Sequence, residues 1–135
     1  MKTFVFTISL ALVLAITLPN HLDADYTDYF EHPEHWNRKG DYMVLANIYA
    51  TKYGVPIRKA KATLKCESNF NNNAVGDGGK AKTLAQFHEP TFIELAEEYR
   101  KETGEILVYG KAFDAIKLFN WAISKGYGEK WTCWK

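Results

Sequence analysis

One stretch of the chain brings an acidic side chain close to polar and aromatic groups. Residues 65–92 read K-C-E-S-N-F-N-N-N-A-V-G-D-G-G-K-A-K-T-L-A-Q-F-H-E-P-T-F. Glu67 falls where a helical pattern ends, and a segment rich in asparagine and glycine follows it. A carboxylic acid can protonate a leaving oxygen when burial raises its pKa towards neutrality. This layout is more typical of a cleft for a large polar ligand than of a hydrophobic core.

The surroundings of Glu67 favour such a raised pKa. A helix C-terminus carries partial negative charge, which disfavours an ionised carboxylate there. Apolar side chains close in sequence could supply a wall that excludes water. A solvated glutamate at a helix end is the ordinary alternative, since most glutamates are exposed. The residues of the expected wall are Leu64, Phe70, Phe87 and Phe92.

The spacing of these motifs resembles the catalytic core of the lytic transglycosylase (goose-type lysozyme-like) family. Sequences of that family carry a helix ending in E-S-x-F, a loop with N-x-x-A, and then a segment like S-x-G-L-x-Q. The matching positions are residues 67–70, residues 71–74, and Leu84 with Gln86. The resemblance covers roughly residues 41–135, and its specific part runs from 66 to 92.

The resemblance implies a peptidoglycan-cleaving glycosidase that acts on the β-1,4 bond between MurNAc and GlcNAc. It implies a single catalytic acid, Glu67, which protonates the leaving oxygen and then acts as a base. The base takes a proton either from the muramic 6-hydroxyl or from water, and we expect the first route, lytic transglycosylation. Ser68 and Gln86 would position the acid and the sugar. Phe87 and His88 are candidate cleft residues, with core packing and helix capping as their alternatives.

Two positions depart from the family pattern. Ala81 stands where the family usually has serine, and Thr83 stands where it usually has glycine, which lets a backbone approach a ligand closely. The alternatives are therefore a catalytically impaired peptidoglycan-binding module of the same fold, or a structural part of an envelope-spanning machine.

A two-carboxylate glycosidase is a further possibility, and it needs a second acid across the bond. The nearest candidate is Asp77, in the glycine-rich segment. We expect this segment to be a mobile loop that holds an attacking water poorly, because catalysis depends on a fixed orientation of the attacking group. The sequence therefore predicts 1,6-anhydromuramic products.

The elements that must position Glu67 are predicted to be helices. Apolar residues recur at helical spacing in segments 41–53, 56–66, 90–103 and 112–125. Asp41 is the expected N-cap of the first segment, and Pro56 opens the second. Residues 68–82 are expected to be loop, and residues 106–109 are the one short strand-like stretch. With the resemblance, this pattern predicts a mainly α, single lysozyme-like domain of about five helices.

The N-terminal segment predicts export. Lys2 precedes an uncharged, mostly apolar run from Phe4 to Leu18, which is shorter than the ~20 residues of a membrane span. Such a run is typical of a secretory signal. We therefore expect a signal peptide at 1–24, or an uncleaved anchor, then a linker at 25–40 and the transglycosylase domain at 41–135. The protein would be secreted, periplasmic or associated with the cell envelope.

The charge balance limits the classes of binding partner that we expect, and the cysteine content predicts a disulfide. The chain has 17 basic and 16 acidic residues, a balance that argues against a nucleic-acid binder. We expect a monomer that acts on peptidoglycan glycan strands without a cofactor. Cysteines in exported proteins usually pair, so a Cys66–Cys133 disulfide is expected, with a nucleophilic Cys66 as the alternative. His32 and His35 are interpreted as loop histidines, and no metal site is assigned.

Overall fold

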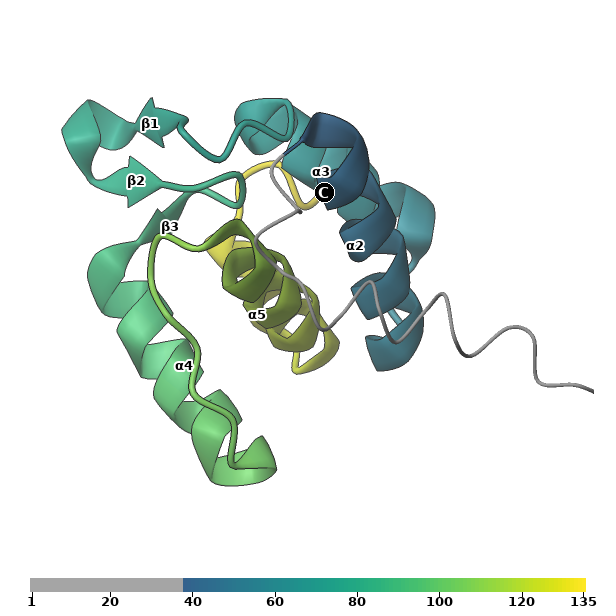
Figure 1. Cartoon of the computed structure of the whole chain (residues 1–135), viewed down its shortest axis with the longest axis vertical. Coiled ribbons are helices and arrows are strands. Elements are labelled where there is room, and N and C mark those ends of the chain that lie inside the picture. The colour runs from purple at the N-terminus through teal and green to yellow at the C-terminus, as the bar shows by residue number, and fades with distance from the viewer. Residues whose placement is uncertain (1–37) are drawn as a thin grey trace, which may run out of the picture. The chain divides into compact units, whose positions relative to one another are not determined.

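Four α-helices make up most of residues 38–135, the part of the chain that the computed structural model describes (Figure 1). The signal segment, His32, His35 and most of the expected linker lie outside the described residues. The mainly α class expected from the sequence is confirmed. No helix of residues 38–135 is both long enough and apolar enough to cross a membrane. The helices are α2 (Lys39–Tyr53), α3 (Ile57–Ser68), α4 (Glu89–Thr103) and α5 (Ala112–Ser124).

The first two helices differ slightly at their ends from the expected bounds. Helix α2 begins at Lys39, so Asp41 is not its N-cap but lies in its first turn. There the Asp41 carboxylate accepts the backbone N–H of Arg38 at 3.1 Å, which satisfies a donor that the helix leaves free. Helix α3 follows Pro56 and continues to Ser68, and Asn69 ends it in the left-handed conformation. Glu67 therefore lies within the last turn of α3.

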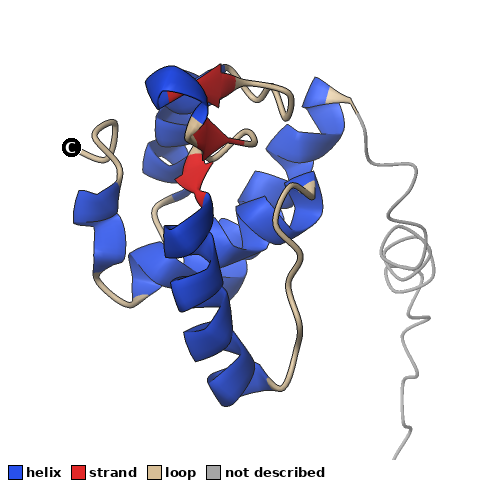
Figure 2. Ribbon diagram, turned by 90° about the vertical axis from the view of Figure 1, so that its left-hand side faces the viewer, coloured by secondary structure: helices blue, strands red, loops and turns tan. Residues whose placement is uncertain are grey.

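The segment expected to be loop contains two strands of a small antiparallel sheet, and the third strand follows it. Strands β1 (Val75–Gly76), β2 (Ala81–Lys82) and β3 (Phe87–His88) pair in the order β1-β2-β3 (Figure 2). A short 3-10 helix, η2 (Asp77–Gly79), forms the turn between β1 and β2. The loop prediction for 68–82 is wrong in this part, because two-residue strands carry no readable alternation. The strand-like stretch at 106–109 is not a strand.

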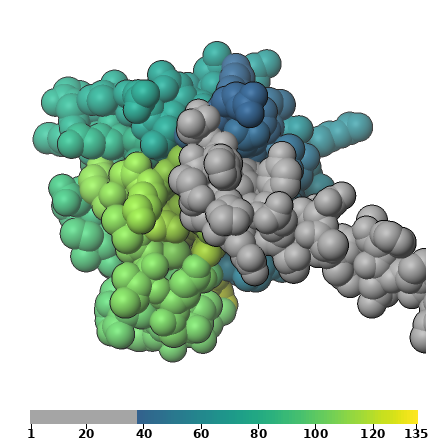
Figure 3. Space-filling model, viewed as in Figure 1, coloured from purple at the N-terminus to yellow at the C-terminus, as the bar shows by residue number. Residues whose placement is uncertain are grey.

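Helix α5 is the centre of the core. It packs against α2 and α4, and it lies between them in Figure 1. All but three of its residues are buried. In the space-filling view, the sheet region lies along the upper edge, above α4 and the 104–111 connection (Figure 3). This arrangement places the sheet and the end of α3 at one end of the described part.

Aromatic side chains connect this core to the C-terminal tail, which begins with the 3-10 helix η3 (Tyr127–Lys130). Trp131 is buried, and its ring meets Phe87 and Phe119 edge-to-face at centroid distances of 5.2 and 4.9 Å. Its indole N–H donates to the carbonyl of Ala85 at 2.8 Å. Edge-to-face pairs are a preferred aromatic geometry, so the tail is held against the segment that leads into β3.

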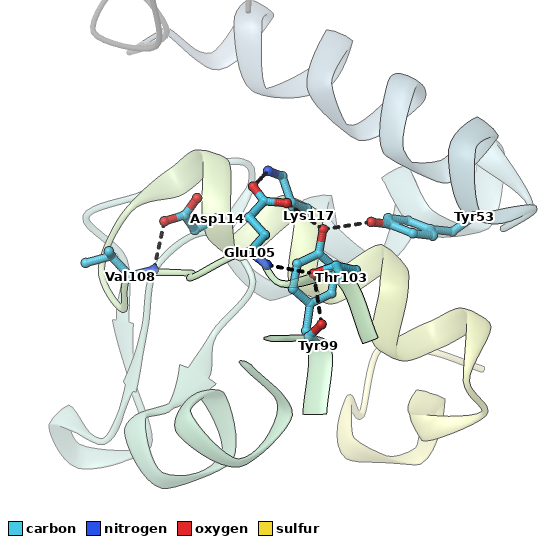
Figure 4. A network of polar contacts seen from close by, with 7 residues as sticks. All are labelled: Tyr53, Tyr99, Thr103, Glu105, Val108, Asp114 and Lys117. Atoms are coloured by element: carbon cyan, nitrogen blue, oxygen red, sulfur yellow. Dashed lines mark hydrogen bonds and ion pairs between the residues drawn. The ribbon is translucent and has the colours of Figure 1, made fainter. Parts of the chain in front are cut away.

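A polar network joins three helices away from that end (Figure 4). The buried ammonium of Lys117 on α5 pairs with the carboxylate of Glu105. Tyr99 on α4 donates its hydroxyl to Glu105 at 2.9 Å and lies 3.1 Å from the hydroxyl of Tyr53 on α2. Burial opposes ionisation of Glu105, but the bonds from Lys117 and Tyr99 outweigh it and lower its pKa. The network stabilises the helix packing that supports the sheet.

Candidate functional site

A pocket of about 340 Å³ opens beside the last turn of α3. Parts of the chain that are distant in sequence form its walls: α3, the β1–β2 hairpin, β3 with the start of α4, and the C-terminal tail. The expected site residues Glu67, Gln86, Phe87 and His88 all line it, whereas Ser68 does not. The volume falls in the range typical of ligand sites.

Glu67 is one of the two carboxylic acids that line this pocket, and it is half-buried. Its Oε1 accepts the backbone N–H of Cys133, with an N–O distance of 3.3 Å. Burial raises the pKa of Glu67, the Cys133 hydrogen bond lowers it by less, and the negative charge of Asp77 raises it further. The net pKa is above the usual value for a glutamate. Glu67 therefore keeps its proton to higher pH than an exposed glutamate would, as a general acid must.

The expected disulfide is present and adjoins this acid. Cys66 and Cys133 are bonded, and their Cα atoms lie 6.0 Å apart. The alternative of a nucleophilic Cys66 is therefore wrong, because its sulfur is already bonded. Cys133 is held both by this bond and by its N–H on Glu67, so the disulfide keeps the tail against the carboxylate.

Ser68 acts on the end of α3 rather than in the pocket. Its hydroxyl lies 2.6 Å from the carbonyl of Leu84 and 3.4 Å from that of Leu64 in its own helix. The shorter bond joins the last turn of α3 to the segment that leads into β3. Ser68 therefore fixes the position of Glu67 indirectly, by anchoring the helix end that presents it.

Gln86 shapes one wall of the pocket. Its side-chain amide donates to the carbonyls of Thr83 at 2.8 Å and Ala74 at 3.1 Å. Its Oε1 lies so close to Gly76 that a Cβ atom there would be only 2.5 Å away. A side chain at position 76 would therefore force the Gln86 amide to move. Because backbone carbonyls already take up its amide N–H groups, Gln86 stabilises the pocket more than it offers donors to a ligand.

The two positions that depart from the family pattern differ in their effect on the pocket. Ala81 lines the pocket from β2. Thr83 is buried and adopts a left-handed backbone with φ of 69°, which favours glycine. Its hydroxyl has no hydrogen-bond partner among residues 38–135. The left-handed backbone of Thr83 is strained. Its side chain is not part of the pocket lining, so it does not reduce the volume of the pocket.

Asp77 and His88 are in hydrogen-bond contact at the pocket. Asp77 lies at the turn of the β1–β2 hairpin, and its Oδ2 is 2.7 Å from Nε2 of His88 on β3. The segment around Asp77, which was expected to be a mobile loop, is a 3-10 turn between two paired strands, and this contact gives its carboxylate a partner. Nothing in the sequence pattern pointed to the pair, because it forms only when β3 lies beside the hairpin.

The C-terminal tail contributes a wall that sequence reasoning missed. Lys130, Trp131 and Thr132 all line the pocket. The sequence feature that could have predicted this wall is the expected disulfide, because a bond at Cys133 brings the neighbouring residues of the tail to the end of α3. What the spacing of the cysteines did not reveal is that Trp131 would be buried against Phe87.

Comparisons with protein-family models, curated proteins and solved structures found no match to this chain. Among the described residues, no group of three or more His, Cys, Asp and Glu side chains is placed to hold a metal ion.

Proposed function

We propose that this chain is an exported glycosidase that cleaves the β-1,4 bond between MurNAc and GlcNAc in peptidoglycan by lytic transglycosylation. It would act as a monomer on glycan strands. The observation that carries the proposal is Glu67, a half-buried carboxyl with a raised pKa in an open pocket. The resemblance of residues 66–92 to lytic transglycosylases supports the same substrate. The disulfide supports export, since such bonds persist in oxidising compartments.

The proposed reaction uses one carboxyl group in two protonation states. Glu67 donates its proton to the glycosidic oxygen while the bond from that oxygen to C1 of MurNAc breaks. The resulting carboxylate then accepts the proton of the muramic 6-hydroxyl as O6 bonds to C1. The products are a GlcNAc end and a 1,6-anhydromuramic end, and Glu67 is ready for another cycle. Because the 6-hydroxyl belongs to the reacting sugar, its attack needs little further positioning.

The pocket walls suit this substrate class. Phe87 and Trp131 give the pocket an apolar side, while Gln86, Thr91 and Thr132 supply polar edges. Amphipathic sugar rings need both kinds of surface. Trp131 is locked by its indole hydrogen bond and ring contacts, so this wall keeps its shape when no ligand is bound.

Replacing Glu67 by Gln tests the proposal. The variant keeps the size of the side chain and removes the acid, so we expect release of soluble muropeptides to fall at least about 100-fold. Circular dichroism and sedimentation with purified cell walls should show unchanged folding and binding. Glu97→Gln is the matched control, because Glu97 carries a carboxylate on α4 that pairs with Arg100 outside the pocket.

Two results would contradict the assignment. Unchanged muropeptide release by Glu67→Gln would show that another group is the acid. Binding of cell walls by the native chain without any cleavage would favour the impaired binding module instead, and it would direct attention to Ala81 and Thr83.

A further inference from the structure

A second pocket, of about 510 Å³, lies between the start of α2 and the loop that follows α3. Lys39 and Tyr42 of α2 line it together with residues 69–73, and we call it the asparagine pocket. It shares no lining residue with the pocket of Glu67, and its volume is typical of ligand sites. Glu67 and Asn69 are close in sequence but line different pockets, so the last turn of α3 separates the two. Cleavage through Glu67 makes no use of the second one.

The loop wall of the asparagine pocket is fixed by its own contacts. The side-chain amide of Asn72 donates to the carbonyl of Gly110 at 3.2 Å. The backbone N–H of Asn73 donates to Oδ1 of Asn71 at 3.0 Å. Phe70 has a left-handed backbone with φ of 59°, and its side chain is buried in the core. Such a conformation persists only where the surrounding structure holds it, so this wall has a defined shape before any ligand binds.

The asparagine pocket presents mainly hydrogen-bond donors. Oδ1 of Asn69 already accepts from Nζ of Lys39 at 2.6 Å, and Oδ1 of Asn71 accepts the N–H of Asn73. Within residues 38–135, no hydrogen bond engages the side-chain nitrogens of Asn69, Asn71 and Asn73 or the hydroxyl of Tyr42. The ammonium of Lys39 has three donors, and two of them remain. These groups suit a ligand that brings several acceptor oxygens.

The charge of the pocket favours an anionic ligand. Among the described residues that line it, Lys39 is the only charged one, and its side chain is exposed. The neighbouring acid Asp41 does not line the pocket, and its carboxylate is engaged by the N–H and the guanidinium of Arg38. Hydrogen bonds from an ammonium to a carboxylate are about twice as strong as neutral ones. A carboxylate therefore matches both the donors and the charge of the pocket.

We propose that the asparagine pocket binds the terminal carboxylate of a peptide stem, the short peptide that peptidoglycan carries on MurNAc. This inference rests on the proposed function, because the cell-wall polymer supplies such a stem. A stem of five residues spans at most about 17 Å when extended, whereas an α-helix with its side chains is about 10–12 Å across. A stem on a strand beside Glu67 is therefore long enough to pass around the end of α3. The site selects strands with free stem ends over strands whose stem ends are bonded to a neighbouring stem.

Isothermal titration calorimetry with a synthetic pentapeptide stem measures this site separately from cleavage. The comparison probe is the same peptide with its C-terminal carboxylate converted to an amide. The amide lacks the negative charge that Lys39 would bind. We therefore expect the native chain to bind the acid form at least about tenfold more tightly than the amide form.

Two variants test the residues that would hold the carboxylate. Asn71→Asp keeps the oxygen that accepts the N–H of Asn73, and it replaces the free amide donor by an anionic oxygen. This variant and Lys39→Gln should each weaken binding of the acid form at least about tenfold, with folding unchanged by circular dichroism. Lys52→Gln is the matched control and should bind like the native chain. It removes the same charge from α2, about 20 Å along the helix from Lys39, and Lys52 does not line the pocket.

Three outcomes would overturn the inference. Equal affinity of the native chain for the acid and amide peptides would overturn it and leave the proposed cleavage standing. Equal weakening by Lys39→Gln and Lys52→Gln would show a general attraction between charges instead of a site. Sedimentation with stem-free glycan strands that Asn71→Asp abolishes would assign the pocket to sugar. Selective binding of the acid peptide by a native chain that releases no muropeptides would support the site and reject the proposed glycosidase.

Discussion

Replacing both cysteines by serine removes the covalent bond that holds the C-terminal tail at the end of α3. Cys66 is exposed and Cys133 is partly exposed, so the serine hydroxyls of the double variant Cys66→Ser/Cys133→Ser can meet water. The substitution therefore removes the cross-link without burying a new unpaired polar group. The expected result is a folded but less stable protein.

The size of the loss follows from the loop that the bond closes. The two cysteines are separated by 67 positions in the sequence. The chain-entropy model assigns a loop of this length a stabilisation of about 4 kcal/mol at 25 °C. For a domain of this size, 1 kcal/mol corresponds to roughly 4–8 °C in Tm, so the expected fall is roughly 15–30 °C.

The same change should alter the acid. The N–H of Cys133 bonds to Glu67, and a hydrogen bond to a carboxylate favours its ionised form. The tail also lines the pocket of Glu67, and burial is the larger cause of the raised pKa, so a loosened tail lowers the pKa of Glu67 on balance. Because the proposed reaction needs protonated Glu67, activity falls as pH rises through this pKa. The alkaline limb of the pH–activity profile should therefore move to lower pH in the variant.

Thermal denaturation followed by circular dichroism measures the first effect. The native chain is compared with and without excess dithiothreitol, and the double variant serves as the control that the reductant should leave unchanged. Thiol titration shows that reduction is complete. A Tm that stays the same after complete reduction would refute the reasoning, because it would mean that the tail is held fully by its aromatic and hydrogen-bond contacts.

Two further stability predictions follow from the structure. Replacing Thr83 by Gly should stabilise the fold by roughly 1 kcal/mol. Relief of the left-handed backbone stabilises the folded state by about 1–2 kcal/mol, whereas the greater conformational entropy of glycine in the unfolded chain costs about 0.5–1 kcal/mol. A lower urea midpoint for the variant would contradict this prediction. Lys117→Met should destabilise the protein by roughly 1–2 kcal/mol at neutral pH, less than for a fully buried pair because 42% of the Glu105 side chain is exposed. The pKa of Glu105 is lower in the folded protein than in the unfolded chain. The ionised carboxylate therefore stabilises the fold at pH values above the unfolded-state pKa, and this contribution is lost as the pH falls through the folded-state pKa. The gap between Lys117→Met and the native chain should therefore close in acid, and urea titrations at neutral and acidic pH that show a constant gap would contradict the pairing.

The sequence by itself determined the helices and the place of the acid. Helical periodicity and start signals such as Pro56 act within a few residues, so they can be read without knowledge of the fold. The four predicted helical segments correspond to α2, α3, α4 and α5, with shifts of at most two residues at their ends. The disulfide was also predictable, because two cysteines in a chain expected to be exported leave one possible pair.

Only the tertiary structure decided what surrounds Glu67. A strand of two residues has no sequence pattern of its own. The three strands form because β2 pairs with β1 along one edge and with β3 along the other. The left-handed backbone of Thr83 runs against the preference of a β-branched residue, so local reasoning could not place it.

The pocket itself depends on contacts between distant residues. Asp77 meets His88 across 11 positions, and the indole of Trp131 meets the carbonyl of Ala85 across 46. The first contact arises from the pairing of β3 with the hairpin and the second from the packing of the tail, and no local pattern encodes either. The sequence therefore located the proposed acid and the nearest second carboxylate, Asp77, whereas the contact of Asp77 with His88 and the wall formed by the tail emerged only when the chain was folded.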